Sequence, residues 1–376
     1  MIRPVAVVAV VAVVAAAAGL CLTLAAPSLA QPSRGAAQAS TDLTVMPPVS
    51  TRYVPKRTAW GDPDLRGTWP LNDVAELPVS RPDQYGNRFF KNDAEIAAEK
   101  ARNDQLQTGY AKEDKDNRIG NGHWIEYLGG SRRTSMVVDP PSGKLPPMTP
   151  QAQALYKAGR SSWTPNTKYD WVTDFDSWDR CISRGFPASM LPFRYNNGIR
   201  IYQSPGNVTI ALEMLGTRII PIGTRQHWPA AVESWLGNSV GHWEGTTLVI
   251  ETTNLKSGDS ATRSSYARNG SPLNMATRGV PPWNTIPTST LAKVTERLTM
   301  TGPNTIAYQM TYSDPQVFTA PWTLRFDWTR DNKYAFYEYA CFEGDVQVRN
   351  YITASRAGRL KEATAEEGAA ESGGGG

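Results

Sequence analysis

"GHWEGTTLVIETTNL", residues 241–255, is the stretch from which the fold class follows. Two segments with alternating apolar and polar side chains flank a Glu-Gly pair, and this pattern predicts two antiparallel strands joined by a tight turn. In such a hairpin the residues beside the turn face each other. We therefore expect His242 opposite Thr247 and Trp243 opposite Thr246.

The same pattern repeats on both sides of this hairpin. Tight turns are expected at 215–216, 302–304 and 330–332, and "KYAFYEYA" (333–340) would be the second strand of the last hairpin. In "PWTLRFDWT" (321–329) four large apolar side chains alternate with polar ones. Many antiparallel strands in succession predict a mainly β protein, a meander that forms a lipocalin-like barrel or a sandwich.

Short helices are expected mainly in the N-terminal part of the chain. Residues 92–109 favour a helix that Asn92 caps, and the polar stretch 111–124 is expected to be a loop. Residues 134–159 predict a strand, a Pro-Pro-Ser-Gly turn and a short helix with Pro150 in its first turn.

The N-terminus is typical of a secretory signal peptide. Arg3 precedes an apolar run at 5–20, and Ser28-Leu29-Ala30 matches a cleavage site, so residues 1–30 are expected to be removed. The apolar run is short for a membrane-spanning helix, which needs about 20 residues, although a membrane anchor is the alternative. We expect a periplasmic or secreted protein with no stable membrane span after cleavage.

The remaining chain predicts one domain with extended ends. Residues 31–58 are polar and contain proline, which favours an extended leader, and residues 59–355 hold the predicted strands in a single β-rich domain. Residues 356–376 are charged and end in "SGGGG", which predicts a disordered tail.

Charge and cysteine content narrow the partners and the chemistry. The formal net charge is +4, and the basic residues are spread along the chain, so no nucleic-acid partner is expected. Cys181 and Cys341 follow the signal segment and would form a disulfide in an oxidising compartment, with two buried free thiols as the alternative. The chain has no nucleotide-binding glycine motif and no zinc-type histidine spacing, so no cofactor and no metal are expected.

Three residues form the candidate catalytic group. His227 lies in an irregular loop, and histidine is the side chain best suited to proton transfer near neutral pH. A two-residue turn at 215–216 would pair Glu213 with Arg218 on one face of the sheet. This pair would orient His227 or the substrate, and the alternative is a structural cross-strand ion pair.

The candidate substrate-binding residues lie mostly in the polar segment 174–206. Arg184, Tyr195 and Asn196 would bind a hydroxyl or an oxyanion, and the alternative is a loop held by ion pairs and Cys181. His242 joins them because of the direction in which its strand presents it. The aspartates at 174, 176 and 179 suggest calcium only weakly, since the rest of an EF-hand loop is missing.

Five segments, in order, resemble a family of uncharacterised secreted proteins that is common in acidobacteria and in sphingomonad-like proteobacteria. These segments are "VVDPPSGKLPPMTPQAQA", "DRCISRGFP", "YNNGIRIYQSPGNVTIALEMLGTRIIP", "SVGHWEGTTLVIETTNL" and "DPQVFTAPWTLRF…YEYACFEG". The resemblance implies export and one β-rich unit but no reaction. It places His227 at the histidine of the family's G-R-P-H-P loop, whereas Thr246 replaces the Asp of its W-E-G-D-T pattern.

These observations leave three functional hypotheses. The first is a cofactor-independent acid–base enzyme, a lyase, isomerase or hydratase, that acts on a small hydroxylated or aromatic compound. The second is a non-enzymatic binding protein for a small hydrophobic ligand, and the third is a metal-dependent hydrolase that uses Asp176, Asp179 and a histidine. A concave pocket that holds His227, Glu213 and Arg218 together would favour the enzyme. Their separation would favour a binding or structural role.

Overall fold

The computed structural model describes residues 42–373 with short gaps. The gaps are residues 119, 121–129, 166, 224, 265–266, 269 and 276–282. The predicted signal peptide and the first part of the predicted leader lie outside the described residues. The described residues all belong to one compact unit.

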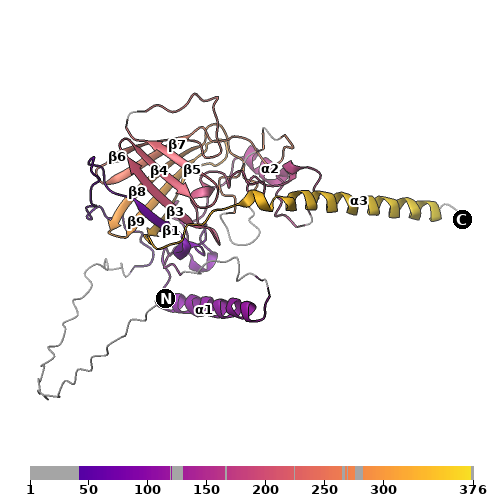
Figure 1. The fold of residues 1–376 in the computed structure, drawn as a ribbon, viewed down its shortest axis with the longest axis horizontal. Coiled ribbons are helices and arrows are strands. Elements are labelled where there is room, and N and C mark those ends of the chain that lie inside the picture. The colour runs from indigo at the N-terminus through magenta and orange to yellow at the C-terminus, as the bar shows by residue number, and fades with distance from the viewer. Residues whose placement is uncertain are drawn as a thin grey trace, which may run out of the picture. The chain divides into compact units, whose positions relative to one another are not determined.

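In the described part of the chain, ten strands form two antiparallel sheets, which confirms the mainly β class (Figure 1). The first sheet has the order β1 (Gly67–Pro70), β3 (Gly198–Ser204), β4 (Asn207–Leu212), β5 (Thr217–Pro221). The second has the order β2 (Val137–Asp139), β10 (Trp322–Thr329), β9 (Thr305–Ser313), β8 (Lys293–Gly302), β7 (Thr247–Thr253), β6 (Asn238–Glu244). Among the described residues, hydrogen bonds close neither sheet into a barrel.

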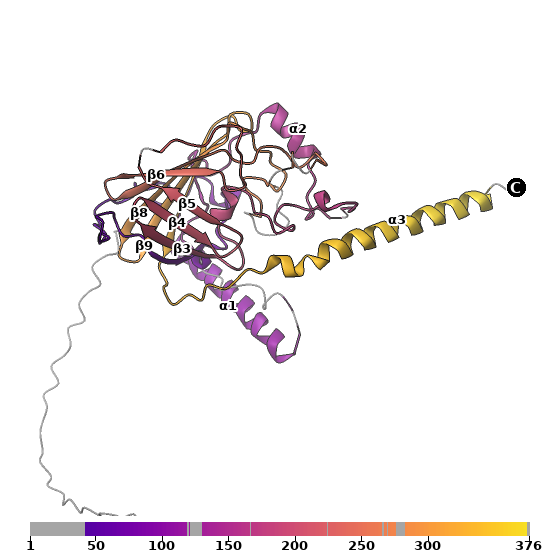
Figure 2. The ribbon, with the colours of Figure 1, turned by 45° about the horizontal axis from the view of Figure 1, so that its top comes forward.

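The described residues also form three α-helices. In both ribbon views they lie outside the sheets (Figures 1 and 2). They are α1 (Asp93–Lys115), α2 (Pro150–Ala158) and α3 (Val346–Gly373). Single-turn 3₁₀ helices cover Asn72–Val74, Asp83–Tyr85, Val172–Asp174, Ala188–Met190 and Cys341–Gly344. Within the described part of the chain, none of the helices combines the length and apolar composition needed to cross a bilayer.

The predicted helix starts are confirmed by their capping hydrogen bonds. The Glu95 amide donates to Asn92 Oδ1 over 2.9 Å, and the Glu95 carboxylate accepts from the Asn92 amide over 2.8 Å. This reciprocal capping box starts α1. Thr149 Oγ1 accepts from the Ala152 amide over 3.2 Å, and Pro150 occupies the first turn of α2, where a missing N–H leaves no unpaired donor.

The inward faces of the two sheets pack into one continuous core. Trp322, Leu324, Phe326 and Trp328 of β10 are at most 1 % exposed, as the alternation in this strand predicts. Tyr308 of β9 stacks on Trp328 with ring centroids 4.6 Å apart. These large side chains fill the interior of the molecule beside β9 and β10.

The hairpin at residues 241–255 forms with a turn shifted by one residue. Gly245 and Thr246 make the turn, so Trp243 pairs with Leu248 and His242 with Val249. The predicted pairs of Trp243 with Thr246 and of His242 with Thr247 are therefore wrong. The observed register differs from the predicted one by an even number of residues. Because successive side chains alternate between the two faces of a sheet, each side chain still lies on the expected face.

The turn between β4 and β5 is longer than predicted, and this changes the faces. Ala211 pairs with Thr217 and Ile210 with Arg218, while the Leu212 amide donates to the Gly216 carbonyl over 3.0 Å. The predicted pair of Glu213 with Arg218 is therefore wrong. A register change by an odd number of residues moves a side chain to the opposite face of the sheet.

Two C-terminal segments also differ from the expectation. Residues 333–340, predicted as a strand, have no regular structure, because Glu213 binds the chain there: its carboxylate accepts from Tyr334 Oη and from the Tyr337 amide. Residues 356–373, predicted as disordered, continue α3. Their Ala, Glu, Lys and Arg content has high helix propensity.

Candidate functional site

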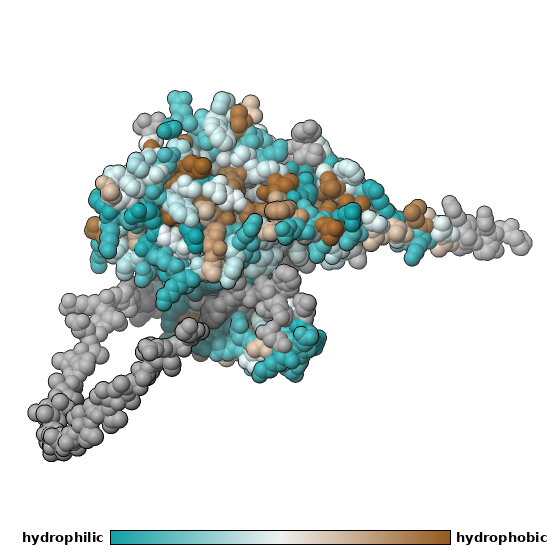
Figure 3. Space-filling model, in the orientation of Figure 1, coloured by the Kyte–Doolittle hydropathy of each residue, from teal (hydrophilic) through white to brown (hydrophobic). Residues whose placement is uncertain are grey.

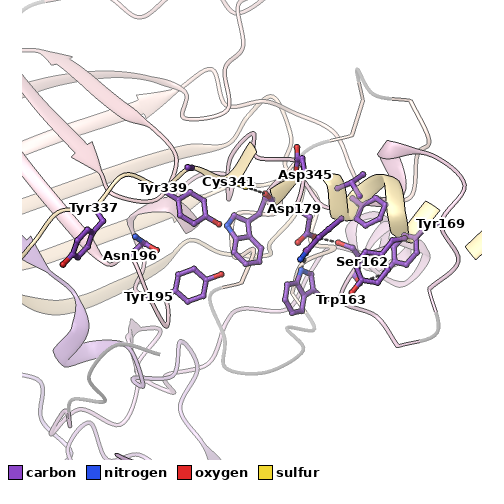
Figure 4. A pocket seen from close by; sticks show the side chains of 16 residues that line it. Ser162, Trp163, Tyr169, Asp179, Tyr195, Asn196, Tyr337, Tyr339, Cys341 and Asp345 are labelled. Atoms are coloured by element: carbon purple, nitrogen blue, oxygen red, sulfur yellow. Dashed lines mark hydrogen bonds between the residues drawn. The ribbon is translucent and has the colours of Figure 1, made fainter. Parts of the chain in front are cut away.

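A cavity of about 820 Å³ lies between the loop segment 162–196 and the C-terminal segment 337–351 (Figure 4). Of its sixteen lining residues, eight are aromatic and eight belong to the C-terminal segment. We call it the aromatic cavity. Figure 3 shows hydrophobic residues at the surface near the start of α3, and Tyr351 in the first turns of this helix is 56 % exposed.

The disulfide between Cys181 and Cys341 joins the two walls of the aromatic cavity. The two Cα atoms lie 5.6 Å apart although 160 residues separate them in sequence, which confirms the predicted bond. Further contacts hold α3 against the loop segment. The Tyr169 amide donates to Ser355 Oγ over 2.9 Å, and Arg359 pairs with Asp170.

Stacked aromatic pairs form the apolar surface of the cavity. Trp163 and Trp178 stack with ring centroids 5.7 Å apart. Tyr169 and Phe175 stack at 4.4 Å, and Tyr351 of α3 lies at a tilt 5.8 Å from Tyr169. Such surfaces bind the flat or apolar part of a small organic molecule.

Asp179 places a carboxyl group among these rings. Its Oδ2 accepts hydrogen bonds from Ser162 Oγ and, over 3.1 Å, from Trp163 Nε1, as Figure 4 shows. Burial raises the pKa of Asp179 to about 7, and the carboxylates of Asp176 and Asp345 add to the rise. The group therefore changes its charge near neutral pH.

Two tyrosines supply hydroxyl groups on the opposite side of the cavity. Tyr195 and Tyr339 hydrogen-bond to each other, and burial raises the pKa of both hydroxyls. Figure 4 shows both hydroxyls pointing toward the middle of the cavity. Tyr195 and Asn196, which the sequence suggests as substrate-binding residues, both line this site.

Arg184 lies behind the wall rather than on it. Its guanidinium donates to the carbonyls of Leu191 and Met275 over 2.9 and 3.2 Å, and it lies 5.0 Å from the ring centroid of Phe193. Only 3 % of the residue is exposed, and burial lowers its pKa to about 10. Arg184 thus supports the loop that carries Tyr195.

The three candidate catalytic residues are not assembled into one site. Arg218 forms a fully buried ion pair with Glu296 of β8, over 3.0 and 2.5 Å, and also donates to Ser239 and Thr252. Glu296 accepts a further bond from Tyr308 Oη over 2.8 Å. This network links strands of both sheets and uses both terminal nitrogens of Arg218 and both carboxylate oxygens of Glu296.

Glu213 and His227 have separate partners. Besides its two bonds to the 334–337 segment, Glu213 accepts from the Gly198 amide over 2.8 Å. His227 lies on the loop before β6, and its Nδ1 donates to Oδ1 of Asn238, the first residue of β6, over 3.0 Å. His242 is exposed on β6, 3.4 Å from Glu244, and neither histidine lines the aromatic cavity.

The aspartates of the 174–179 segment do not form a described metal site with a histidine. Asp174 pairs with Arg160 over 2.9 Å, and Asp176 Oδ2 accepts from Ser161 and Asn284 over 2.7 and 2.8 Å. Within the described residues, the group of side chains with metal-binding spacing is Cys181, Cys341 and Asp345. Its two sulfurs are already joined in the disulfide, so they are not available as thiolates.

Several residues of the aromatic cavity did not figure in the sequence analysis as site residues. Trp163, Trp178, Tyr339 and Tyr351 lie in two aromatic-rich segments that are far apart in sequence. The predicted disulfide was the one signal that could have found them, because it brings these two segments together.

Comparisons with known proteins add no relative to this description. Nothing among the family models, the curated proteins or the solved structures matches the chain.

Proposed function

We propose that the protein binds a small organic molecule with an aromatic or apolar body in the aromatic cavity. The observation that carries this proposal is the cavity itself, about 820 Å³ in volume and lined by eight aromatic side chains. Ligand sites in proteins are typically concave, roughly 300–1,000 Å³ in volume, and mostly apolar with a few polar groups. Asp179, Asn196 and the tyrosine pair would orient the ligand.

The arrangement of the expected catalytic residues also favours binding over catalysis by His227. Arg218 and Glu213 are committed to structural partners in the core and at the C-terminal segment. His227 lies on a loop outside the cavity. A general base must reach the proton that it removes, and none of these three side chains lines the aromatic cavity.

Fluorescence titration with a set of soluble aromatic compounds tests the proposal. A bound ring against Trp163 would quench the indole emission, and Trp163→Ala would weaken binding about tenfold because a stacking partner is lost. Trp228→Ala is the matched control, since Trp228 is 46 % exposed and outside the cavity. Unchanged affinity in Trp163→Ala, or no saturable binding of any compound, would overturn the proposal.

A second candidate function is acid–base catalysis in the same cavity, with Asp179 in the role first expected for His227. The favouring observation is the pKa of about 7 at Asp179, which suits proton transfer near neutral pH. The reaction class remains a lyase, isomerase or hydratase without a cofactor. In a turnover screen, Asp179→Asn would abolish activity while His227→Ala would retain it; equal activity of Asp179→Asn and the parent would exclude this role.

We further propose that the protein works outside the cytoplasm, after cleavage at Ala30. The disulfide between Cys181 and Cys341 supports an oxidising compartment. Protein recovered from the exported fraction would begin at Gln31, and N-terminal sequencing would detect this. Retention of Met1 in all fractions would contradict it.

We also infer that the two sheets are parts of one interrupted barrel rather than a sandwich. Two contacts between sheet edges support this. Ile222, just after β5, forms an isolated bridge with Gly241 of β6, and the Asp331 amide after β10 donates to the Thr68 carbonyl of β1 over 3.0 Å. Hydrogen–deuterium exchange would find both edges protected in a barrel, whereas fast exchange along both edges would indicate a sandwich.

A further inference from the structure

The charged groups that line the aromatic cavity are all acidic. Asp179 and Asp345 contribute carboxyl groups, and none of the sixteen lining residues is Lys, Arg or His. The remaining polar lining consists of hydroxyl and amide groups. An anionic ligand would therefore find no counter-charge on the wall, whereas a cation would find two acidic groups.

The aromatic surfaces of the cavity also attract cations. The face of an aromatic ring carries partial negative charge, and a cation that lies over it is stabilised, most strongly over tryptophan. Trp163 and Trp178 form one such surface, and Asp179 is anchored to it through Trp163 Nε1. A weakly hydrated cation gains most from this arrangement, because little hydration is lost when it enters an apolar cavity.

Asp179 forms no ion pair with a cation of the described residues, and Arg180 interacts with it electrostatically without a direct hydrogen bond or ion pair to its carboxylate. The Oδ2 atom of Asp179 accepts from Ser162 and Trp163. The carboxyl is mostly buried, and burial disfavours its charged form. A bound cation would supply the missing counter-charge.

We propose that the ligand of the aromatic cavity is an organic cation, an alkylated ammonium compound with apolar or aromatic substituents. Its charged centre would lie against the Trp163 and Trp178 rings and the Asp179 carboxylate, and its apolar part would lie against Tyr169 and Tyr351. This inference rests on the proposed binding function and names the class of ligand.

Other charged groups around Asp179 do not replace such a cation. Asp176 lies behind the wall and pairs with Arg268 over 3.5 Å, and Asp345 adds negative charge from the C-terminal segment. Arg180, the next residue in the chain, interacts electrostatically with both Asp176 and Asp179 but does not line the cavity. Tyr169 is neutral at working pH, since burial raises its pKa.

On the other side of the cavity the described cation that interacts with the tyrosine pair is Arg184. It lies behind Phe193 and interacts with the hydroxyls of Tyr195 and Tyr339, so its charge faces the tyrosine side. A cationic ligand would therefore occupy the end of the cavity near Asp179 and Trp163. The hydroxyl groups would remain available to its polar substituents.

The proposal gives binding a defined pH dependence. Phenyltrimethylammonium keeps its charge at all pH values, whereas Asp179 changes charge near pH 7. The cation favours the ionised carboxylate, so affinity is highest above pH 7 and decreases as the pH falls below it. Binding near pH 7 would release a proton, which calorimetry in buffers of different ionisation enthalpy would detect.

The decisive experiment compares phenyltrimethylammonium with tert-butylbenzene, an uncharged molecule of the same shape, on the full chain at pH 8. The cation is expected to bind at least about tenfold more tightly. Asp179→Asn would remove most of this preference and its pH dependence. Asp116→Asn, which removes one exposed negative charge outside the cavity, is the control and would leave the preference unchanged.

The outcomes separate this inference from the proposed function. Equal or tighter binding of tert-butylbenzene would overturn the cation inference and leave binding of apolar molecules intact. Absence of binding by either compound would overturn both. Asp179→Asn resembles the protonated side chain in shape and charge, and its melting temperature would check that it folds. The pH dependence of the parent protein provides an independent test that needs no variant.

Discussion

At the scale of single residues, the local surroundings of a carboxyl group decide its role. Glu213, Glu296 and Asp179 are all acidic and at least partly buried, yet of the three only Asp179 lines the aromatic cavity. Glu296 has an arginine partner, and Glu213 accepts from a tyrosine hydroxyl and two backbone amides. Asp179 has neutral donors only, and burial raises its pKa to about 7.

The raised pKa of Asp179 predicts a change of stability with pH. The pKa of Asp179 is about 7 in the folded protein, and its ordinary value of 3.8 applies in the unfolded chain. At pH values between these two, the folded protein therefore binds more protons than the unfolded chain. The free energy of unfolding should therefore decrease as the pH rises from about 4 to about 7. Each unit of pKa difference corresponds to about 1.4 kcal/mol.

Asp179→Asn removes this contribution, so its stability should decline less than that of the parent between pH 4 and pH 7. Urea unfolding at several pH values measures the difference. Asp116→Asn is the control and should follow the parent, because Asp116 is exposed. A part of the decline would remain, since burial also raises the pKa of Asp176. Superimposable curves for Asp179→Asn and the parent would show that the group titrates normally.

At the scale of elements, a buried ion pair connects the sheets. Arg218 of β5 and Glu296 of β8 are at most 3 % exposed, and Arg218 also lies 4.5 Å from the ring centroid of Phe186. Removing one partner of such a pair leaves an uncompensated charge in the core, whereas replacing both by apolar residues is far less harmful. The network is therefore a structural element of the core.

Glu296→Leu should lower the free energy of unfolding by about 3–5 kcal/mol, because Arg218 stays buried without its carboxylate. The double variant Arg218→Met, Glu296→Leu should recover a large part of this loss, and urea unfolding measures both. Glu251→Gln is a suitable comparison, since it breaks an exposed ion pair with Lys293 and should cost less than about 1 kcal/mol. A double variant as unstable as Glu296→Leu would refute the interpretation.

At the scale of the whole molecule, the aromatic cavity depends on the attachment of the C-terminal segment. Half of its lining residues lie in the segment 337–351, which belongs to neither sheet. The disulfide, the Glu213 hydrogen bonds and the contacts of α3 with Tyr169 and Asp170 hold this segment in place. The sheets provide the scaffold, and the attached segment completes the site.

Replacing both cysteines, Cys181→Ser with Cys341→Ser, should loosen this wall without dissolving the sheets. Loss of a native disulfide typically costs about 2–5 kcal/mol. Hydrogen–deuterium exchange should rise in residues 337–351 while the amides of β8 and β9 stay protected, and ligand affinity should fall. Unchanged exchange in 337–351 would show that the other contacts suffice.

Local features of this protein followed from the sequence alone. Three such features are the alternation in β10, the capping box at Asn92 and the start of a helix at Pro150. Each depends on neighbouring residues, so a short window of sequence is enough to predict it. The pairing of Cys181 with Cys341 also followed, because only these two cysteines remain after the predicted signal segment.

The tertiary structure alone decided the partners of the polar residues. The period of a strand predicts which residues share a face, but the length of the turn decides which residues of two strands pair. Between β4 and β5, five residues (212–216) separate the paired positions, instead of the expected two. Arg218 thereby met Glu296, 78 positions away, and Glu213 became the anchor of residues 334–337. The aromatic cavity likewise depends on the tertiary structure. Its two walls meet through long-range contacts, which no local sequence pattern contains.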